Sequence, residues 1–141
     1  MKEILEKFKV NFDQNEYSLG AQASDSKIKA AEEELSLSFP EKYKDFLKTF
    51  GWLEVYNNYF FGISNEPLGA GSTVEMTLYA RKHWSLPEEY IVIYSSEDKI
   101  LWCLNCQSAG EKVISYNTET KKIETIVAPN LERLLMDYLE L

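Results

Sequence analysis

The stretch at residues 39–51 reads FPEKYKDFLKTFG and carries the clearest helical pattern in the chain. Pro40 suits the first position of a helix, where its missing N–H is not needed, and Gly51 suits the C-terminal stop. Between them, four apolar side chains follow the i, i+3, i+4, i+7 spacing of one helix face. These side chains are Tyr43, Phe46, Leu47 and Phe50. The pattern predicts an amphipathic helix that packs on a core.

Two further helices are expected on the N-terminal side of this stretch. Apolar residues recur at helical spacing near the start of the chain, at Ile4, Leu5, Phe8 and Phe12. A polar stretch, residues 14–24, separates them from a second helix, for which residues 24–26 offer N-cap candidates. The apolar face of that second helix consists of Ile28, Ala31 and Leu35.

The pattern changes after Gly51, where aromatic and β-branched residues predict strands. Residues 52–56 and 59–63 are expected to form two strands joined by a turn at Asn57 and Asn58. Residues 69–72 read as a loop, and residues 74–82 favour a short helix capped by Ser72 or Thr73.

Four strands and a last helix are expected in the remainder of the chain. The strand segments come in two pairs with short polar turns, at residues 91–94 with 100–104 and at residues 112–116 with 122–127. Such short connections make antiparallel hairpins, because parallel strands need a long crossover. Asn130 then caps a terminal helix rich in leucine, up to Leu139.

This order of helices, strands and one more helix predicts an α+β fold. We expect an antiparallel or mixed β-sheet of about five to six strands, flanked by the N-terminal helices and the C-terminal helix. The chain has 141 residues, of which 45% are hydrophobic and 13% aromatic. That length and composition predict a single domain over residues 1–141 with one buried core.

The charge of the chain restricts the partners that it can bind. Fifteen basic and 23 acidic residues give a net charge of −8, which disfavours direct nucleic-acid binding and favours a basic protein partner. No apolar run reaches the roughly 20 residues of a membrane-spanning helix. The first residues alternate charged and apolar side chains, unlike a signal peptide. We therefore expect a cytoplasmic protein with no membrane partner.

The sequence Trp-Cys-x-x-Cys at residues 102–106 resembles the motif of a thioredoxin-type redox centre. Thioredoxin-type chemistry needs the first cysteine at a helix N-terminus, where its pKa is lowered. Here a strand follows the motif, so we expect Cys103 within a strand or at its end and Cys106 in the turn after it. Cysteine is among the most buried residue types, and a structural role is favoured for both thiols.

Other sites with chemical activity are not indicated by the residues. His83 is the one histidine, and with two cysteines it falls short of a closed zinc site. The Gly-x-Gly at residues 69–71 lacks the lysine of a phosphate-binding loop. Adjacent acidic pairs do not by themselves converge in a pocket. We predict no catalytic residue, no cofactor and no metal ion.

The order of these motifs resembles the SUKH superfamily. The resemblance begins with Ile28 and Glu32, continues through the stretch at residues 39–51, and includes Tyr59-Phe60-Phe61-Gly62 and Leu86-Pro87 before the later strands. In that family the penultimate position of the helix stretch is commonly asparagine, where this chain has Phe50. The match covers nearly the whole chain from Ile28.

The resemblance implies a protein-binding role for the chain. Bacterial members of the superfamily are mostly immunity proteins that neutralise toxins, often nucleases, and others are regulatory or scaffold modules. The family has no agreed catalytic residues. The expected partner is therefore a cognate toxin that is basic because it binds phosphates, and the alternatives are a scaffold without a toxin partner and a small hydrolase that uses the carboxylates.

Exposed acids and aromatics in the predicted turns are the candidates for partner binding. They follow from expected exposure and charge and from no motif. The candidates are Tyr56, Asn57, Asn58, Glu66, Glu88, Glu89, Glu97 and Asp98.

Overall fold

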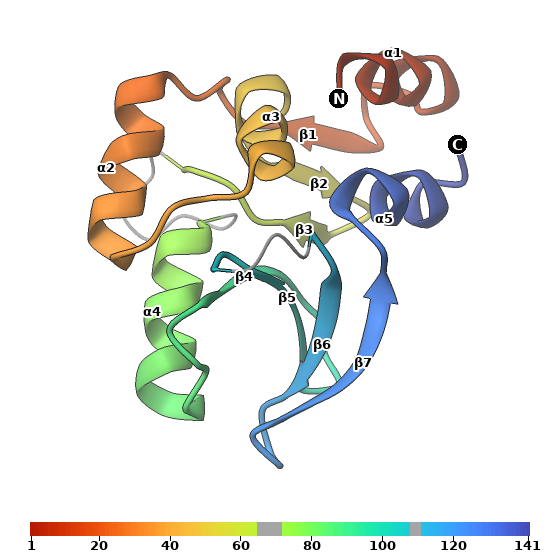
Figure 1. The fold of residues 1–141 in the computed structure, drawn as a ribbon. Coiled ribbons are helices and arrows are strands. Elements are labelled where there is room, and N and C mark those ends of the chain that lie inside the picture. The colour runs from red at the N-terminus through yellow and green to blue at the C-terminus, as the bar shows by residue number, and fades with distance from the viewer. Residues whose placement is uncertain (65–71, 108–110) are drawn as a thin grey trace.

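The computed structural model describes residues 1–64, 72–107 and 111–141 of the chain. Within these residues it contains five α-helices and one seven-stranded β-sheet (Figure 1), so the expected α+β class is confirmed. None of the helices described is long and apolar enough to cross a membrane. In chain order the elements are α1 (Lys2–Asn11), β1 (Tyr17–Leu19), α2 (Asp25–Leu35), α3 (Glu41–Thr49), β2 (Leu53–Val55), β3 (Asn58–Phe60), α4 (Thr73–Trp84), β4 (Tyr90–Ser95), β5 (Ile100–Asn105), β6 (Val113–Asn117), β7 (Lys122–Ala128) and α5 (Leu131–Tyr138).

The sheet is antiparallel throughout, and each strand pairs with its neighbour in sequence, in the order β1 to β7. Successive strands therefore run in opposite directions, and every second connection lies at the same end of the sheet. The β2–β3, β4–β5 and β6–β7 turns share one end, which we call the turn end. Phe60 of β3 lies opposite Tyr94 of β4, which fixes this relation between the first two turns.

Helices cover both faces of the sheet and divide the buried side chains into two clusters. Helix α4 covers one face, while α1, α3 and α5 gather over the other and α2 stands beside α4 (Figure 1). Strand β5 shows the alternation, because Leu101 and Cys103 belong to the cluster under α4. Leu104 belongs to the larger cluster on the opposite face, with Trp102 packed against it. Successive side chains of a strand point to opposite faces of the sheet, so this one strand contributes side chains to both clusters.

Helix α3 confirms the sequence pattern, with a small shift at its start. Tyr43, Phe46 and Leu47 are buried on its inner face. Pro40 is the N-cap residue rather than the first helical residue, because its ψ of 148° is extended. Gly51 follows the helix with a φ of +73°, a left-handed conformation that glycine adopts without steric cost.

A buried hydrogen bond joins α3 to the segment after β3. The Tyr43 hydroxyl donates to the carbonyl oxygen of Phe61 at 2.7 Å, and burial raises the pKa of the Tyr43 phenol well above its ordinary value. The Tyr43 side chain is fully buried. Its hydroxyl therefore fixes the distance between helix and sheet as well as satisfying a buried carbonyl.

Replacing Tyr43 with phenylalanine is expected to lower the free energy of unfolding by about 1–3 kcal/mol, because the Phe61 carbonyl is left buried without its donor. Urea titration followed by circular dichroism measures the change. Tyr79→Phe on the exposed side of α4 is the matched control, for which we expect almost no loss. Equal stability of Tyr43→Phe and wild type would contradict this assignment.

Two details of the strands differ from expectation. Strand β1 lies within the polar stretch at residues 14–24, where no strand was expected, so the sheet has seven strands instead of the expected five to six. The β2–β3 turn is formed by Tyr56 and Asn57, both with positive φ, and Asn58 is already the first residue of β3. Two successive positive φ angles are typical of the tight hairpin turns that match strand twist, and this places the turn one residue earlier.

Candidate functional site

The two cysteines are in the places expected from the sequence, and neither is activated. Cys103 is buried in β5, and Cys106 lies just after that strand and is partly buried; both are free thiols. Burial raises the pKa of the Cys103 thiol and raises the pKa of Cys106 to about 12. A thiol with such a pKa carries almost no thiolate at neutral pH, and the thiolate is the reactive form.

We expect both thiols to resist alkylation in the folded protein. At pH 7.5, iodoacetamide should modify Cys103 and Cys106 many-fold more slowly than free cysteine, since both pKa values are raised. Mass spectrometry of the intact protein follows the modification. In strong denaturant both sites should react quickly. Rapid modification of folded Cys106 would contradict the raised pKa.

His83 is exposed on α4, where its ring lies 4.2 Å from that of Tyr79, centroid to centroid. Among the residues that the structure describes, no group of three or more histidine, cysteine or acidic side chains could hold a metal ion. The expected loop at residues 69–72 lies outside the described residues except for Ser72. The Ser72 hydroxyl accepts a hydrogen bond from the Glu75 backbone N–H and so caps α4.

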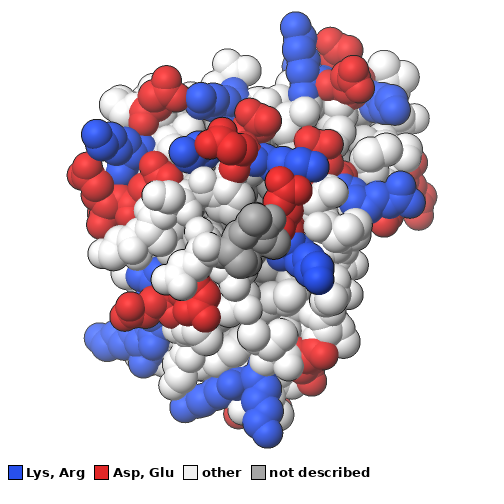
Figure 2. Space-filling model, viewed as in Figure 1, with Lys and Arg blue, Asp and Glu red and all other residues white. Residues whose placement is uncertain are grey.

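On the face shown in Figure 2, the acidic residues behind the net charge of −8 do not form one continuous patch. Figure 2 shows acidic and basic side chains interspersed over the face in view. Mixed charge of this kind keeps a protein soluble and gives a weak overall field at a distance. A docking surface for a basic partner therefore has to be sought where acids stand together without bases.

One cleft in the structure has this property. It has a volume of about 280 Å³ and lies where the segment leading into β1 meets β2 and the β2–β3 turn. We call it the acidic cleft, because two of its lining residues are carboxylates and none is basic. Its lining residues are Asn15, Glu16, Tyr17, Ser18, Glu54, Tyr56 and Asn57.

Tyrosine hydroxyls hold both carboxylates of the acidic cleft. The Tyr56 hydroxyl donates to Glu16, which also accepts a hydrogen bond from the Asp13 backbone N–H at 2.8 Å. These two hydrogen bonds lower the pKa of Glu16. The Tyr59 hydroxyl hydrogen-bonds to Glu54, which raises the pKa of Tyr59. Glu16 is therefore ionised at neutral pH and held in place.

Strand pairing brings these residues together. Glu54 lies directly opposite Ser18 of β1 on one side and Tyr59 of β3 on the other. Tyr56 is 59% exposed at the tip of the β2–β3 turn, where its hydroxyl bridges to the segment before β1. The acidic cleft thus depends on a three-strand arrangement of β1, β2 and β3.

The structure places three of the predicted partner-binding residues at or beside the acidic cleft. Tyr56 and Asn57 line it. Asn58 supports the turn behind them, since its amide donates to the Tyr56 carbonyl at 3.3 Å and its side-chain oxygen accepts from the Tyr94 hydroxyl at 3.2 Å.

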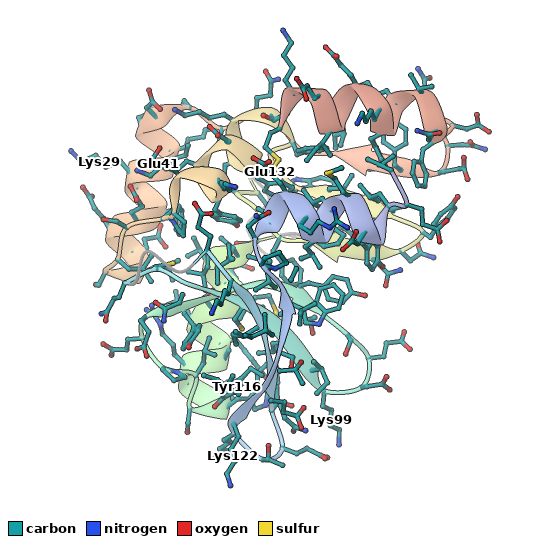
Figure 3. The ribbon with its side chains drawn as sticks, turned by 45° about the vertical axis from the view of Figure 1, so that its right-hand side comes forward. Lys29, Glu41, Lys99, Tyr116, Lys122 and Glu132 are labelled. Carbon is teal, nitrogen blue, oxygen red and sulfur yellow. The ribbon has the colours of Figure 1, made fainter. Side chains whose placement is uncertain are left out.

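Glu97 and Asp98 lie in the β4–β5 turn, also at the turn end of the sheet. Their surroundings are not purely acidic, because Lys99 pairs with Glu119 of the β6–β7 turn. Lys99 and Lys122 project from this end of the molecule in Figure 3. The local charge is therefore mixed, in contrast to the acidic cleft.

Glu88 and Glu89 lie just before β4, at the end of the sheet opposite the turn end. The Glu88 carbonyl accepts a hydrogen bond from Arg81 at 2.8 Å, and the Glu89 carbonyl accepts one from the Cys106 N–H at 2.7 Å. The structure does not bring this pair together with Tyr56 and Asn57. Glu66 lies outside the described residues.

Five of the seven residues that line the acidic cleft, including both carboxylates, Glu16 and Glu54, were absent from the candidates predicted from the sequence. Glu16 precedes a three-residue strand within a polar stretch, and Glu54 alternates with the buried Leu53 and Val55. The alternation in β2 could have indicated that Glu54 points away from the core. Nothing local indicates that β1 exists, and Glu16 was therefore missed.

The residues that carry the family resemblance have structural roles. The Glu32 carboxylate accepts a hydrogen bond from the Phe39 N–H at 2.6 Å and lies 3.8 Å from the Lys44 ammonium. It therefore ties the α2–α3 connection to both helices. Tyr43 joins α3 to the sheet, as described above. Both residues therefore stabilise the packing of the helices and the sheet.

Comparison with known proteins agrees with this fold. A crystal structure of a protein from Pseudomonas syringae pv. tomato is similar with a TM-score of 0.79 over 99% of both chains, at 16% sequence identity, which shows the shared fold alone. No curated protein matches this chain in sequence. The family SUKH_5, described as SMI1-KNR4 cell-wall, matches residues 1–140. Because this match covers nearly the whole chain, the protein belongs to the SUKH_5 family.

Proposed function

We propose that this protein is an immunity protein that neutralises a cognate toxin, a basic nuclease, by stoichiometric binding. Domains of its family often act in this way and are generally non-catalytic. The observation that carries the proposal is the acidic cleft, where Glu16 and Glu54 stand without a basic residue in the lining. Nuclease surfaces that bind phosphates are rich in lysine and arginine, and such side chains fit a cleft with two carboxylates.

The hydrogen bonds in the acidic cleft favour binding of a cation. Glu16 is already held by Tyr56 and Asp13, so less side-chain freedom is lost when a partner binds. Its lowered pKa keeps it charged at neutral pH. Acidic groups at an interface also increase the association rate with a basic partner. The proposed contact surface is centred on the cleft, includes Tyr56, Asn57 and Asn58, and continues along the turn end to Glu97 and Asp98.

The acidic cleft is less suited to hydrolysis. A paired-carboxylate mechanism needs one carboxyl group with a raised pKa, so that it can donate a proton near neutral pH. The pKa of Glu16 is lowered instead. Glu16 therefore serves better as a fixed negative charge than as a general acid.

The proposal is tested by co-expression with the product of the adjacent gene. We expect this chain to co-purify with that product at a 1:1 ratio and to restore growth of cells that express it. Absence of both co-purification and rescue would overturn the proposal. Binding without any effect on growth would instead support the scaffold role considered next.

A regulatory or scaffold role is the second candidate, favoured by the cell-wall description of the matching family. Such a role would use the same protein-binding surface without opposing a toxin. Gene neighbourhood separates the two candidates: a large toxin gene directly upstream supports immunity, and its absence supports the scaffold.

A further inference from the structure

Strand β7 is an edge strand of the sheet, and its side chains are unusually open to solvent. All side chains from Lys122 to Ile126 are exposed, and the sheet ends at β7. Two large apolar side chains lie on this strand, Ile123 with 48% and Ile126 with 60% of their surface exposed. The other edge strand, β1, has only three residues. An exposed edge of this length is a template for pairing with another strand.

The charges on β7 alternate in sign around Ile123, with Lys122 before it and Glu124 after it. Both charges are exposed, and neither is in an ion pair that the structure shows. A uniformly charged edge would repel a second copy of itself. An edge with both signs can instead be complementary to its own copy, provided that the register opposes unlike charges.

Only certain registers are available when an antiparallel strand pairs with its own copy about a two-fold axis. In an antiparallel pair, two residues that lie opposite each other both direct their N–H and C=O groups toward the partner strand, or both direct them away from it. The two-fold axis must therefore pass beside one residue, and that residue lies opposite the same residue of the second copy. An axis at Glu124 would oppose two carboxylates, which is destabilising. An axis at Thr125 is unsuitable, because the β6–β7 pairing is irregular there: two residues of β7, Glu124 and Thr125, lie opposite the single Ser115 of β6.

An axis at Ile123 satisfies both charge and packing. It opposes Ile123 to its copy and places Lys122 opposite the copy's Glu124 on each side of the axis. Two unlike pairs and one apolar pair then lie across the new strand boundary, and each type of pair is favourable in antiparallel sheets. We propose that β7 pairs with β7 of a second copy of this chain in this register, which joins the two sheets into one.

This pairing is independent of the proposed toxin binding. β7 and β1 are the two opposite edges of the sheet, and the acidic cleft is formed at β1 and β2. A dimer through β7 would therefore leave both clefts free. The pairing covers few residues, and interfaces below about 1,000 Å² are generally weak, so we expect a dimer that forms in the micromolar range.

A charge-swap experiment tests the register directly. Sedimentation velocity of the wild type should show a concentration-dependent dimer. Lys122→Glu and Glu124→Lys should each weaken the dimer at least about tenfold, because each opposes like charges twice. An equimolar mixture of the two variants restores both unlike pairs, as does the double variant Lys122→Glu/Glu124→Lys. Dimerisation should return in both samples, which also shows that the variants are folded.

Matched controls carry the same charge changes on exposed positions of α1, as Lys9→Glu and Glu6→Lys, and should dimerise as the wild type does. A wild type that remains monomeric over the micromolar range overturns the proposal. So does a dimer that survives both single reversals. Neither result bears on toxin binding, which is measured separately.

Discussion

Replacing Gly62 with alanine is expected to prevent stable folding. A Cβ atom at this position would lie 1.6 Å from the carbonyl oxygen of Gly51 and 2.7 Å from its carbonyl carbon. The atoms that the Cβ would meet belong to the main chain, and hydrogen bonds hold the main chain in place at both Gly51 and Gly62. Gly51 ends α3 through a hydrogen bond from its N–H to Leu47, and its carbonyl accepts one from Ile63. The Gly62 carbonyl accepts from Thr73 at the start of α4.

The expected loss for Gly62→Ala is more than about 3 kcal/mol, because overpacking against backbone cannot be relieved by a rotamer change. That is a large part of the 5–15 kcal/mol that typically stabilises a domain. Urea unfolding of the purified variant, or its absence from the soluble fraction, measures the effect. Gly20→Ala is the comparison, since its Cβ would meet the partly exposed side chain of Trp52 instead of main chain. A Gly62→Ala protein within 1 kcal/mol of wild type would show that the two segments can separate easily.

The double variant Glu16→Lys/Glu54→Lys is expected to weaken toxin binding at least about 100-fold, or about 2.7 kcal/mol. It places two cations where we propose that the basic partner binds. Glu16 is solvent-exposed in part and Glu54 lies on the outward side of β2, so the fold should persist. Isothermal titration calorimetry with the toxin measures the dissociation constant, and circular dichroism checks the fold.

A matched control separates the effect of net charge on toxin binding from the effect of where the charges lie. Glu6→Lys/Glu34→Lys alters two exposed helix residues and changes the net charge by the same amount as the cleft variant. We expect this control to bind within a few-fold of wild type, since distant exposed charges are screened by salt. Equal weakening by both double variants would mean that the overall charge, rather than the acidic cleft, attracts the toxin.

The helices could be predicted from the sequence because their signals are local. The apolar stripe of α3, the Ser24 cap of α2 and the Asn130 cap of α5 all act within a few residues, and each is present in the structure. The hairpins β4–β5 and β6–β7 were predictable for the same reason, since short polar turns separate their strands.

Strand β1 could not be predicted in this way because its three residues have no pattern of their own. It exists through pairing with β2, which places Tyr17 opposite Val55. Glu16 reaches Tyr56 only as a result of that pairing. The candidate site was therefore half predictable: the turn residues Tyr56 and Asn57 followed from local signals, whereas the carboxylate that Tyr56 holds depended on a long-range contact.

The measurement that tests the central claim most directly is a titration of the toxin's activity with this protein. We predict that nuclease activity falls in proportion to added protein and disappears at an equimolar ratio, as expected for tight stoichiometric binding. The Glu16→Lys/Glu54→Lys variant should leave most activity at the same ratio. Full nuclease activity in the presence of excess wild-type protein would contradict the account.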